Sequence, residues 1–530
     1  MRSAKPALPL TPVRRCVGLR PMNSNRSRLR HYPRFSIQYS FCGRLWPALL
    51  AAAALTARAD VRLPGLFSDH MVLQQGARVP VWGSAEEGEE VTVSFRGREA
   101  KTKAKAGKWM VHLSRLPAGG PGTLVVQGKN RIEIHDVLVG EVWVCSGQSN
   151  MEFPLQRSFE SAADIAGSAN PMLRLFLVPK TKADEPRNDV AAQWKECNPD
   201  TSGNFSAVAY YFGRDLQKAL NVPVGLIDTC WGGSPAEVWM SESTLASNPA
   251  YKRDILDTYA ANLAKSEPSK KGQRPGWKPA ELYNGMIAPL LPYAIKGAIW
   301  YQGESNAPRA RQYRTLFPDM IRNWRRDWGQ GNFPFLAVQL APWDRNQKRT
   351  LETITAKPVE SDWAELREAQ GLATKVLPKV GLAVITDVGD KDDIHPTRKG
   401  PVGARLALAG RGIAYGEKIE YSGPIYKRMK VEGGQAIVSF DHARPGLEAR
   451  GGELTGFAVC GPDKKFVWAK AEIQDDKVVV TSPLVEHPVA VRYGWADFPV
   501  VNLWNKAGLP ASPFRTDDFP MITTPKKSDH

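Results

Sequence analysis

The sequence feature that most constrains the fold of this chain is a nearly continuous apolar run that ends at a glycine. The run covers 137–145 and ends at Ser146-Gly147. An uninterrupted run of this length is typical of a strand buried on both faces, as in a parallel sheet. The chain continues as Gln148-Ser149-Asn150, at the carboxyl edge of such a sheet, where open α/β sheets bind ligands. Ser149 is therefore a candidate nucleophile, although a serine after a strand can equally be a turn or helix N-cap residue.

Strands and helices alternate from 137 to about 416, which predicts an α/β fold. The helical patterns include 310–328 and 204–220, the latter behind an Asn204 cap. Such alternation favours a parallel sheet covered by helices on both faces. The predicted strands are 137–145, 173–178, 222–229, 295–301, 335–340 and 380–388.

The segments on either side of this region read as β structure. Short runs of alternating apolar residues, separated by Gly and Pro turns, fill 60–136 and return after about 417. The sequence therefore predicts β-sandwich-like accessory regions before and after an α/β domain. A polar loop at 266–280 is a candidate lid. The predicted domains are a leader at 1–59, an N-terminal β domain at 60–136, a catalytic α/β domain at 137–416 and a C-terminal β region at 417–530.

The first 59 residues resemble an export signal. Leu45 to Leu55 form a short apolar segment, and Ala57-Arg-Ala59 matches a small-x-small cleavage site, so we expect a mature N-terminus at Asp60. The apolar segment is too short to span a membrane, which argues against stable membrane insertion. A start at Met22 is an alternative to the long stretch before it. We expect an exported protein, periplasmic or extracellular.

Most of the formal net charge of +17 belongs to this leader. Residues 1–59 hold eleven Lys and Arg and no acidic residue, and the rest of the chain holds 60 basic and 54 acidic residues. The remaining balance of +6 does not indicate binding to nucleic acid. Four cysteines follow the leader without metal-binding spacing. Two disulfides could form among them, but buried free thiols are the stronger expectation: Cys145, Cys197, Cys230 and Cys460.

A serine nucleophile needs a base, and one histidine lies within the α/β region. His395 follows the predicted strand 380–388, so it lies at the same sheet edge as Ser149. Asp392 stands three residues before it and Asp393 two, and either carboxylate could orient the imidazole. The alternative is an acidic surface loop with an incidental histidine.

Acyl transfer also needs donors for a developing oxyanion, and glycine turns offer backbone N–H groups. Gly232-Gly233 follow the strand 222–229, and the strand 295–301 is followed by Gln302 and Asn306. Each segment alone could be an ordinary tight turn. Four polar loops at one sheet edge favour a catalytic site.

Four motifs in this order carry a family resemblance: Gly147-Gln-Ser-Asn-Met151, Trp231-Gly-Gly-Ser-Pro-Ala-Glu237, Trp300-Tyr-Gln-Gly-Glu-Ser-Asn306 and Asp393-Ile-His-Pro396. From about 60 to 517 the chain resembles the sialate O-acetylesterase family of the SGNH hydrolase superfamily. The resemblance implies an SGNH-like fold, with Ser149 as nucleophile and oxyanion donor, Gly233 as a second donor, His395 as base and Asp392 as its acidic partner.

Two positions depart from the superfamily pattern. The third motif is one residue longer than usual, so the third oxyanion position could fall to Asn306, Gln302 or Glu304. Two adjacent aspartates leave the choice between Asp392 and Asp393 open.

The sequence thus predicts a secreted serine esterase that removes O-acetyl groups from sugars, above all from O-acetylated sialic acid, and releases acetate. An acetylesterase of xylan or another polysaccharide is one alternative. A glycosidase with Glu304 and Asp387 as paired carboxylates, and a non-catalytic carbohydrate-binding protein, are more distant ones. We expect no cofactor and no metal, because a lone histidine without nearby cysteines makes a poor zinc site.

Overall fold

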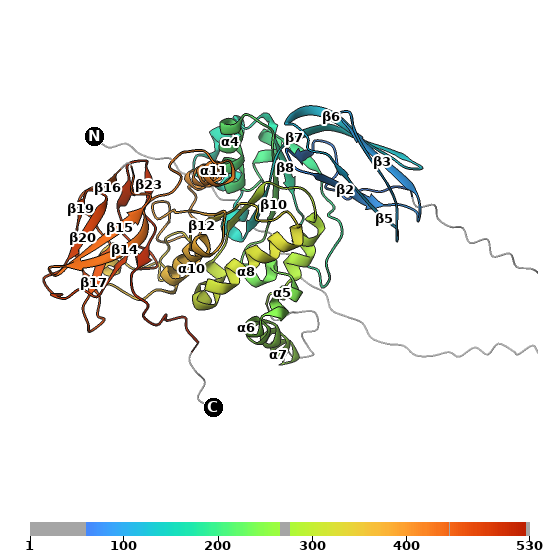
Figure 1. Ribbon diagram of the computed structural model, residues 1–530. Coiled ribbons are helices and arrows are strands. Elements are labelled where there is room, and N and C mark those ends of the chain that lie inside the picture. The colour runs from blue at the N-terminus through green and yellow to red at the C-terminus, as the bar shows by residue number, and fades with distance from the viewer. Residues whose placement is uncertain (1–59, 266–275, 445, 526–530) are drawn as a thin grey trace, which may run out of the picture. The chain divides into compact units, whose positions relative to one another are not determined.

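The computed structural model describes residues 60–265, 276–444 and 446–525 (Figure 1). The predicted leader and signal, 1–59, lies outside these residues, as does 266–275 of the candidate lid. A central sheet flanked by helices, with further β-sheets on both sides of it in the sequence, confirms the predicted α/β class. No helix among the described residues has the length and apolar character needed to cross a bilayer.

The central sheet has the order β13-β12-β11-β7-β10-β8-β9, and its neighbours are parallel except for β9, which runs antiparallel to β8. The six parallel strands confirm the predicted ones, and β9 was not predicted. One bound changes clearly: β13 ends at Ala383, so His395 follows a longer loop than expected. The bounds are β7 Arg131–Gly147, β8 Asn170–Leu177, β9 Trp194–Cys197, β10 Val224–Cys230, β11 Gly297–Tyr301, β12 Phe335–Val338 and β13 Val380–Ala383.

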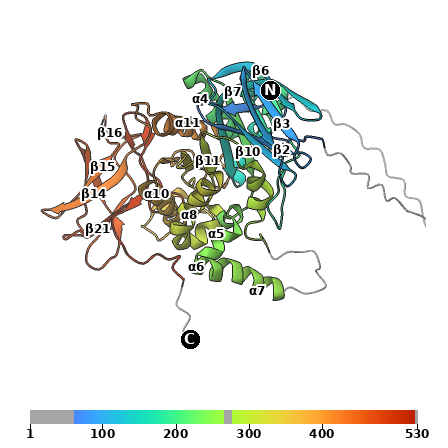
Figure 2. The ribbon, with the colours of Figure 1, turned by 45° about the vertical axis from the view of Figure 1, so that its right-hand side comes forward.

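Helices cover both faces of this sheet, which is why β7 is apolar at successive positions. Val142 and Val144 join the core beneath α8 (Ala310–Trp328) and α10 (Asp362–Val376). Trp143 and Cys145 join the opposite core, beneath α4 (Ala207–Leu220) and α11 (Gly400–Ala414). Figures 1 and 2 show the two helix pairs on opposite sides of the strands.

Helix α4 corrects one prediction. The helix begins at Ala207, and Ser206 caps it by accepting the Ala209 N–H at 3.1 Å. The expected cap, Asn204, instead accepts a hydrogen bond from the Gln156 side chain. Helix α8 has the predicted bounds, and Gly329 follows its last residue with a φ of +66°, which suits glycine.

Strand β7 belongs to two sheets. Its first half pairs antiparallel with β6, and its second half lies between β10 and β11 in the central sheet. The predicted domain boundary at 136/137 therefore falls within one continuous strand of 17 residues. The other N-terminal strands are β1 Val72–Gln74, β2 Val79–Ser84, β3 Glu90–Phe95, β4 Arg98–Lys103, β5 Lys108–Leu113 and β6 Gly119–Gln127.

The C-terminal strands enclose a third apolar core. They form three small antiparallel sheets, β14-β15-β20-β19, β16-β22-β23 and β18-β17-β21-β24. The bounds are β14 Ile425–Glu432, β15 Gln435–Asp441, β16 Leu447–Ala449, β17 Phe457–Cys460, β18 Val467–Trp468, β19 Lys470–Gln474, β20 Lys477–Thr481, β21 Ala490–Tyr493, β22 Leu503–Asn505, β23 Leu509–Pro510 and β24 Phe514–Arg515.

Short helices connect these elements. All four cysteines after the leader are buried free thiols, as expected. The short α-helices are α1 Ser149–Glu152, α2 Ser161–Ala166, α3 Pro199–Ser202, α5 Glu242–Ser247, α6 Pro249–Tyr251, α7 Thr258–Lys265 and α9 Leu351–Thr355. The 3-10 helices are η1 Leu155–Arg157, η2 Ala236–Trp239, η6 Ala288–Leu290 and η7 Glu304–Arg309. The π helices are η3 Lys252–Asp257 and η5 Tyr283–Ile287.

Candidate active site

A glycine turn places Ser149 at the carboxyl end of β7. Gly147 has a φ of +143°, and a Cβ there would lie 2.2 Å from the Tyr301 carbonyl oxygen. Only glycine allows β7 and β11 to approach this closely at such a φ. The Gln148 N–H donates to the same carbonyl at 3.0 Å, so the turn before Ser149 is fastened to the end of β11.

The structure brings Ser149 and His395 together. Ser149 is the first residue of α1, and its Oγ lies 2.8 Å from Nε2 of His395. His395 reaches it from the loop that follows β13, at the same edge of the sheet. A neutral imidazole at this distance can accept the hydroxyl proton of an attacking serine.

The two aspartates differ in their contacts. Asp393 Oδ1 lies 3.6 Å from His395 Nδ1 and accepts the His395 backbone N–H at 2.8 Å. The carboxylate of Asp392, first choice by motif spacing, instead contacts the Lys391 ammonium. Both aspartate side chains are 60% exposed. The structure therefore places Asp393, and not Asp392, beside the imidazole.

Burial dominates the electrostatics of His395. It lowers the pKa of the imidazole below its ordinary value, because the charged form loses hydration. Asp393 opposes this shift, whereas the charges of Lys399 and Arg157 add to it. His395 is consequently held in the neutral form that a general base requires.

Two loops supply the candidate oxyanion donors. A Cβ on Gly232 would lie 3.2 Å from the Ser149 Cβ, so this turn runs directly beside the serine. The Gly232 N–H donates to Glu152 at 2.5 Å, whereas no described residue accepts the Gly233 N–H. The Ser305 hydroxyl donates to the Gly233 carbonyl at 3.0 Å and ties the two loops together.

The two predicted side-chain donors, Gln302 and Asn306, differ in whether they keep an uncommitted amide hydrogen. Gln302 donates both amide hydrogens, to Ser234 O at 3.3 Å and to Asn306 Oδ1 at 2.7 Å. Asn306 donates to Glu237 at 3.0 Å, which leaves one amide hydrogen uncommitted. Both side chains are fully buried. Gln302 therefore supports the loop and has no hydrogen left for an oxyanion, while Asn306 retains one.

The sequence missed a buried network directly behind Ser149. Asn150 is fully buried and donates to Glu304 at 2.6 Å and to the Ile394 carbonyl at 3.0 Å, while its own oxygen accepts from Lys399 Nζ at 2.5 Å. Burial lowers the pKa of Lys399 to about 7 and raises that of Glu304. The motif contained Asn150 and Glu304, but nothing in the local sequence marks Lys399 as buried.

The glycosidase alternative finds no support in the positions of its carboxylates. Arg405 donates two hydrogen bonds to Asp387, at 2.6 and 2.8 Å. Glu304 is bonded to Asn150. The second oxygen of Glu304 is buried without a hydrogen-bond partner among the described residues, so Asp387 is held in an ion pair and Glu304 is enclosed, and the two are not placed as an acid and nucleophile pair.

An aromatic wall adjoins the glycine turn that runs beside the serine. Trp231, which precedes the glycine pair, packs edge-on against Trp277 with ring centroids 5.5 Å apart. The Lys182 ammonium lies over both rings, 4.2 Å from that of Trp277, and Lys180 lies over Trp231. Sugar rings stack on such faces, and the ammonium groups add a positive potential.

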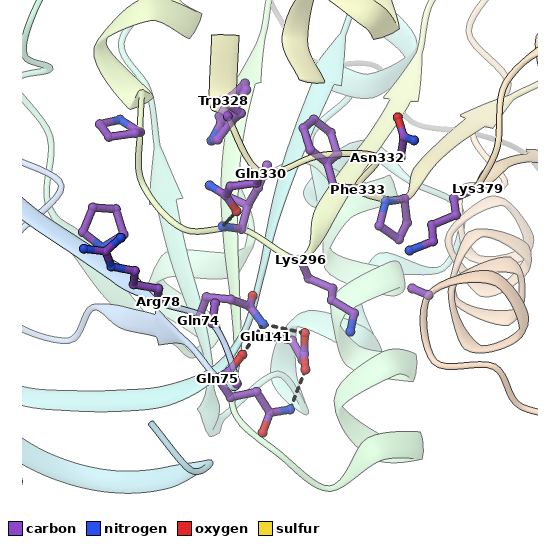
Figure 3. A pocket seen from close by; sticks show the side chains of 18 of the residues that line it. Gln74, Gln75, Arg78, Glu141, Lys296, Trp328, Gln330, Asn332, Phe333 and Lys379 are labelled. Atoms are coloured by element: carbon purple, nitrogen blue, oxygen red, sulfur yellow. Dashed lines mark hydrogen bonds between the residues drawn. The ribbon is translucent and has the colours of Figure 1, made fainter. Parts of the chain in front are cut away.

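A polar cavity of about 870 Å³ lies at the opposite edge of the sheet (Figure 3). Its lining includes Glu141, which accepts from Gln74 at 3.0 Å, and the residues just before three strands, Lys296, Phe333 and Lys379. Because these are the amino ends of parallel strands, the cavity is separate from Ser149.

Among the described residues, one group has metal-ligand spacing: His70, Asp136 and Glu196. The Arg174 guanidinium lies between its carboxylates, 2.5 Å from Asp136 and 3.3 Å from Glu196. Burial alone would raise the pKa of Asp136, but this cation and His70 together hold it below its usual value. The group is therefore an ion-pair cluster, remote from Ser149 in the sequence, and the positive guanidinium is unsuited to a metal site.

Comparison with known proteins agrees with this geometry. Residues 139–409 match the family model described as carbohydrate esterase, sialic acid-specific acetylesterase. Sialate O-acetylesterase of Homo sapiens is 28% identical over 511 residues, covering 88% of this chain and 94% of that protein, and that of Pongo abelii is 29% identical with the same coverage. A crystal structure of a carbohydrate acetylesterase from Xanthomonas citri is 41% identical, covers 87% of this chain and 100% of the other, and superposes with a TM-score of 0.77. The chain is therefore a carboxylic ester hydrolase and belongs to the family of sialic acid-specific carbohydrate acetylesterases.

Proposed function

We propose that this protein is an exported serine esterase that removes O-acetyl groups from sugars, with Ser149 as nucleophile and His395 as general base. The 2.8 Å contact between Ser149 Oγ and His395 Nε2 carries the proposal. Asp393 is the acidic partner, because it is the carboxylate nearest the imidazole. The N–H groups of Ser149 and Gly233, with the remaining hydrogen of Asn306, are the oxyanion donors.

The reaction then proceeds in two halves. Ser149 Oγ attacks the acetyl carbonyl while His395 takes its proton, and the tetrahedral intermediate collapses as the imidazolium returns that proton to the departing sugar oxygen. Water, deprotonated by His395, attacks the acetyl–serine ester, and the second tetrahedral intermediate collapses to acetate as the imidazolium returns the proton to Ser149 Oγ. Every proton is exchanged between groups named here, so the chemistry needs no metal ion.

We further propose that the preferred sugar carries a carboxylate, as O-acetylated sialic acid does. Support comes from the names of the relatives and from the cations near Ser149: Lys180 and Lys182 at the tryptophan wall, and Arg157, whose charge reaches His395. Both lysines also contact acidic residues, Glu152 and Glu281, so a substrate carboxylate would compete with these. Acetylated xylan, which is neutral, is the alternative substrate.

Acetate release from three substrates tests this assignment. We expect kcat/KM to be highest for O-acetylated sialic acid, lower for the same sugar with its carboxylate converted to an amide, and lowest for acetylated xylan. Equal rates on the acid and the amide would remove the carboxylate preference while leaving the esterase assignment intact. Covalent labelling of Ser149 by a fluorophosphonate separates an esterase from a carbohydrate-binding protein without activity.

Export is part of the proposal and rests on the apolar segment and small-x-small site before Asp60. Intact mass measurement of the protein recovered outside the cytoplasm of its host would show an N-terminus at Asp60. Retention of the leader in that fraction would contradict cleavage there.

A further inference from the structure

Two buried groups of opposite charge lie behind Ser149 and take no part in the reaction steps above. Lys399 is only 1% exposed, and the carboxylate of Glu304 is buried as well. Burying an ammonium and a carboxylate is costly unless both are well partnered. The contacts of Lys399 and Glu304 should therefore explain why two charged groups are buried at this place.

Both groups contact the amide of Asn150, from opposite ends. Lys399 Nζ donates to Asn150 Oδ1, and Asn150 Nδ2 donates to Glu304 Oε1 at 2.6 Å. An ammonium has only donors and a carboxylate only acceptors, so the pair permits one orientation of the amide. A flipped amide would set its NH₂ against the ammonium and its oxygen against the carboxylate.

The orientation of this amide matters because its second hydrogen holds the histidine loop. Asn150 Nδ2 donates to the Ile394 carbonyl at 3.0 Å. Ile394 directly precedes His395, and Asn150 directly follows Ser149. One fully buried side chain thus connects the segments that carry the nucleophile and the base, whereas Asp393 stands 3.6 Å from the imidazole and is largely exposed.

We propose that Lys399 and Glu304 are positioning residues of the esterase, which fix the Asn150 amide so that it holds His395 at hydrogen-bonding distance from Ser149. The inference rests on the proposed function. On this proposal the two buried charges act by keeping His395 at the right distance from Ser149. A small displacement of the base from the hydroxyl would lower the rate without weakening substrate binding.

The charge of Lys399 has a second consequence, because it is one of three charges that face His395. Asp393 favours the imidazolium, and Lys399 and Arg157 disfavour it. Removing the ammonium should raise the pKa of the imidazole, so that the acid limb of the kcat/KM profile moves to higher pH. Lost packing that leaves the imidazole buried has no such effect.

The test uses Lys399→Met in the full chain, with an aryl acetate as substrate. We expect kcat to fall roughly 10- to 100-fold, KM to stay within about threefold, and the acid limb to rise by about 0.3–1 pH unit. Lys379→Met, an exposed lysine at the opposite sheet edge, is the matched control and should change none of these. A Lys399→Met enzyme within twofold of wild type, with an unmoved acid limb, would overturn the inference.

Glu304 supplies a second test that holds if Lys399→Met does not fold. Glu304→Gln keeps an oxygen for Asn150 and should retain most of the activity, whereas Glu304→Ala removes it and should lose roughly tenfold or more in kcat. Equal losses in both variants would count against positioning through the amide. These outcomes are read against active wild-type enzyme, so a wild type without esterase activity would contradict the proposed function instead.

Discussion

Ser149 Oγ and His395 Nε2 lie 2.8 Å apart although 246 positions separate them in the chain. The sheet order explains the meeting only in part, because β12 and β11 stand between β13, which precedes His395, and β7, which precedes Ser149. The loop after β13 must cross both strand ends to reach the serine. The Asn150 bond to Ile394 is one contact that holds it there.

Replacement of the serine is the first prediction. Ser149→Ala should lower kcat by roughly 10³-fold or more, since no other hydroxyl of the residues that the structure describes is hydrogen-bonded to His395. The melting temperature should stay within a few degrees of wild type, because the hydroxyl makes little packing contact. Activity within tenfold of wild type would remove Ser149 from the mechanism, and fluorophosphonate labelling of both proteins provides an independent readout.

The two aspartates should respond differently to removal of their charge. Asp393→Asn should reduce kcat/KM roughly tenfold, because its carboxylate is the one beside Nδ1, while Asp392→Asn should stay within about twofold. Steady-state kinetics on an aryl acetate would measure both. A larger loss for Asp392→Asn would mean that the loop rearranges when substrate binds.

The pH profile should report the burial of His395. A base works only when neutral, so kcat/KM should be constant above the imidazole pKa and fall as the pH drops through it. Because burial lowers this pKa, we expect the midpoint of the acid limb below about 6.5, the ordinary histidine value. A midpoint above that value would show that Asp393 outweighs burial in the working enzyme.

The turn before the nucleophile should not tolerate a side chain. Gly147→Ala would place a Cβ 2.2 Å from the Tyr301 carbonyl oxygen at a φ of +143°, so we expect a loss of roughly 2–4 kcal/mol in the free energy of unfolding and of most activity. Gly371→Ala is the matched control, since it lies within α10 and, apart from its chain neighbours and the backbone of its own helix, no atom lies within 4 Å of where its Cβ would stand. It should be neutral or stabilise by up to about 1 kcal/mol, measured by denaturant unfolding.

Chelators should leave the activity unchanged. Incubation with EDTA, followed by assay on an aryl acetate, should return the untreated rate, because the proposed reacting groups are a serine, a histidine with its aspartate, and amide N–H donors. Activity that disappears on chelation and returns with a divalent ion would overturn the serine mechanism.

The sequence predicted best what depends on local pattern. The apolar run of β7 and the glycine that ends it located Ser149, because burial on both faces leaves a mark in composition. The choice between Asp392 and Asp393 was out of reach, since it depends on a side-chain contact with Lys391. The burial of Lys399 could not be predicted either. Lysine in a polar segment is usually exposed, and only the packed fold buries this one.

Gln302 is a residue for which the sequence suggested a role that its tertiary contacts do not allow. As a polar residue at a strand end it looked like a free donor, but it bonds to Ser234, Asn306 and Tyr313, partners that the tertiary fold brings to it. Spacing in a motif shows which residues lie near a site, whereas the contacts of each hydrogen decide which of them can act on a substrate.

The shared strand β7 makes the N-terminal β region inseparable from the esterase. A chain started at Val137 would keep every reacting group yet strip β6 and β1 from the same strand that ends at Ser149, exposing an apolar edge prone to pairing with other molecules. Exchanging this region between relatives would therefore also replace the strands that pair with β7, the strand that leads to Ser149. In the intact protein the N-terminal β region and the α/β domain should unfold in a single transition, because both contain β7. Unfolding of either one should therefore unfold the other.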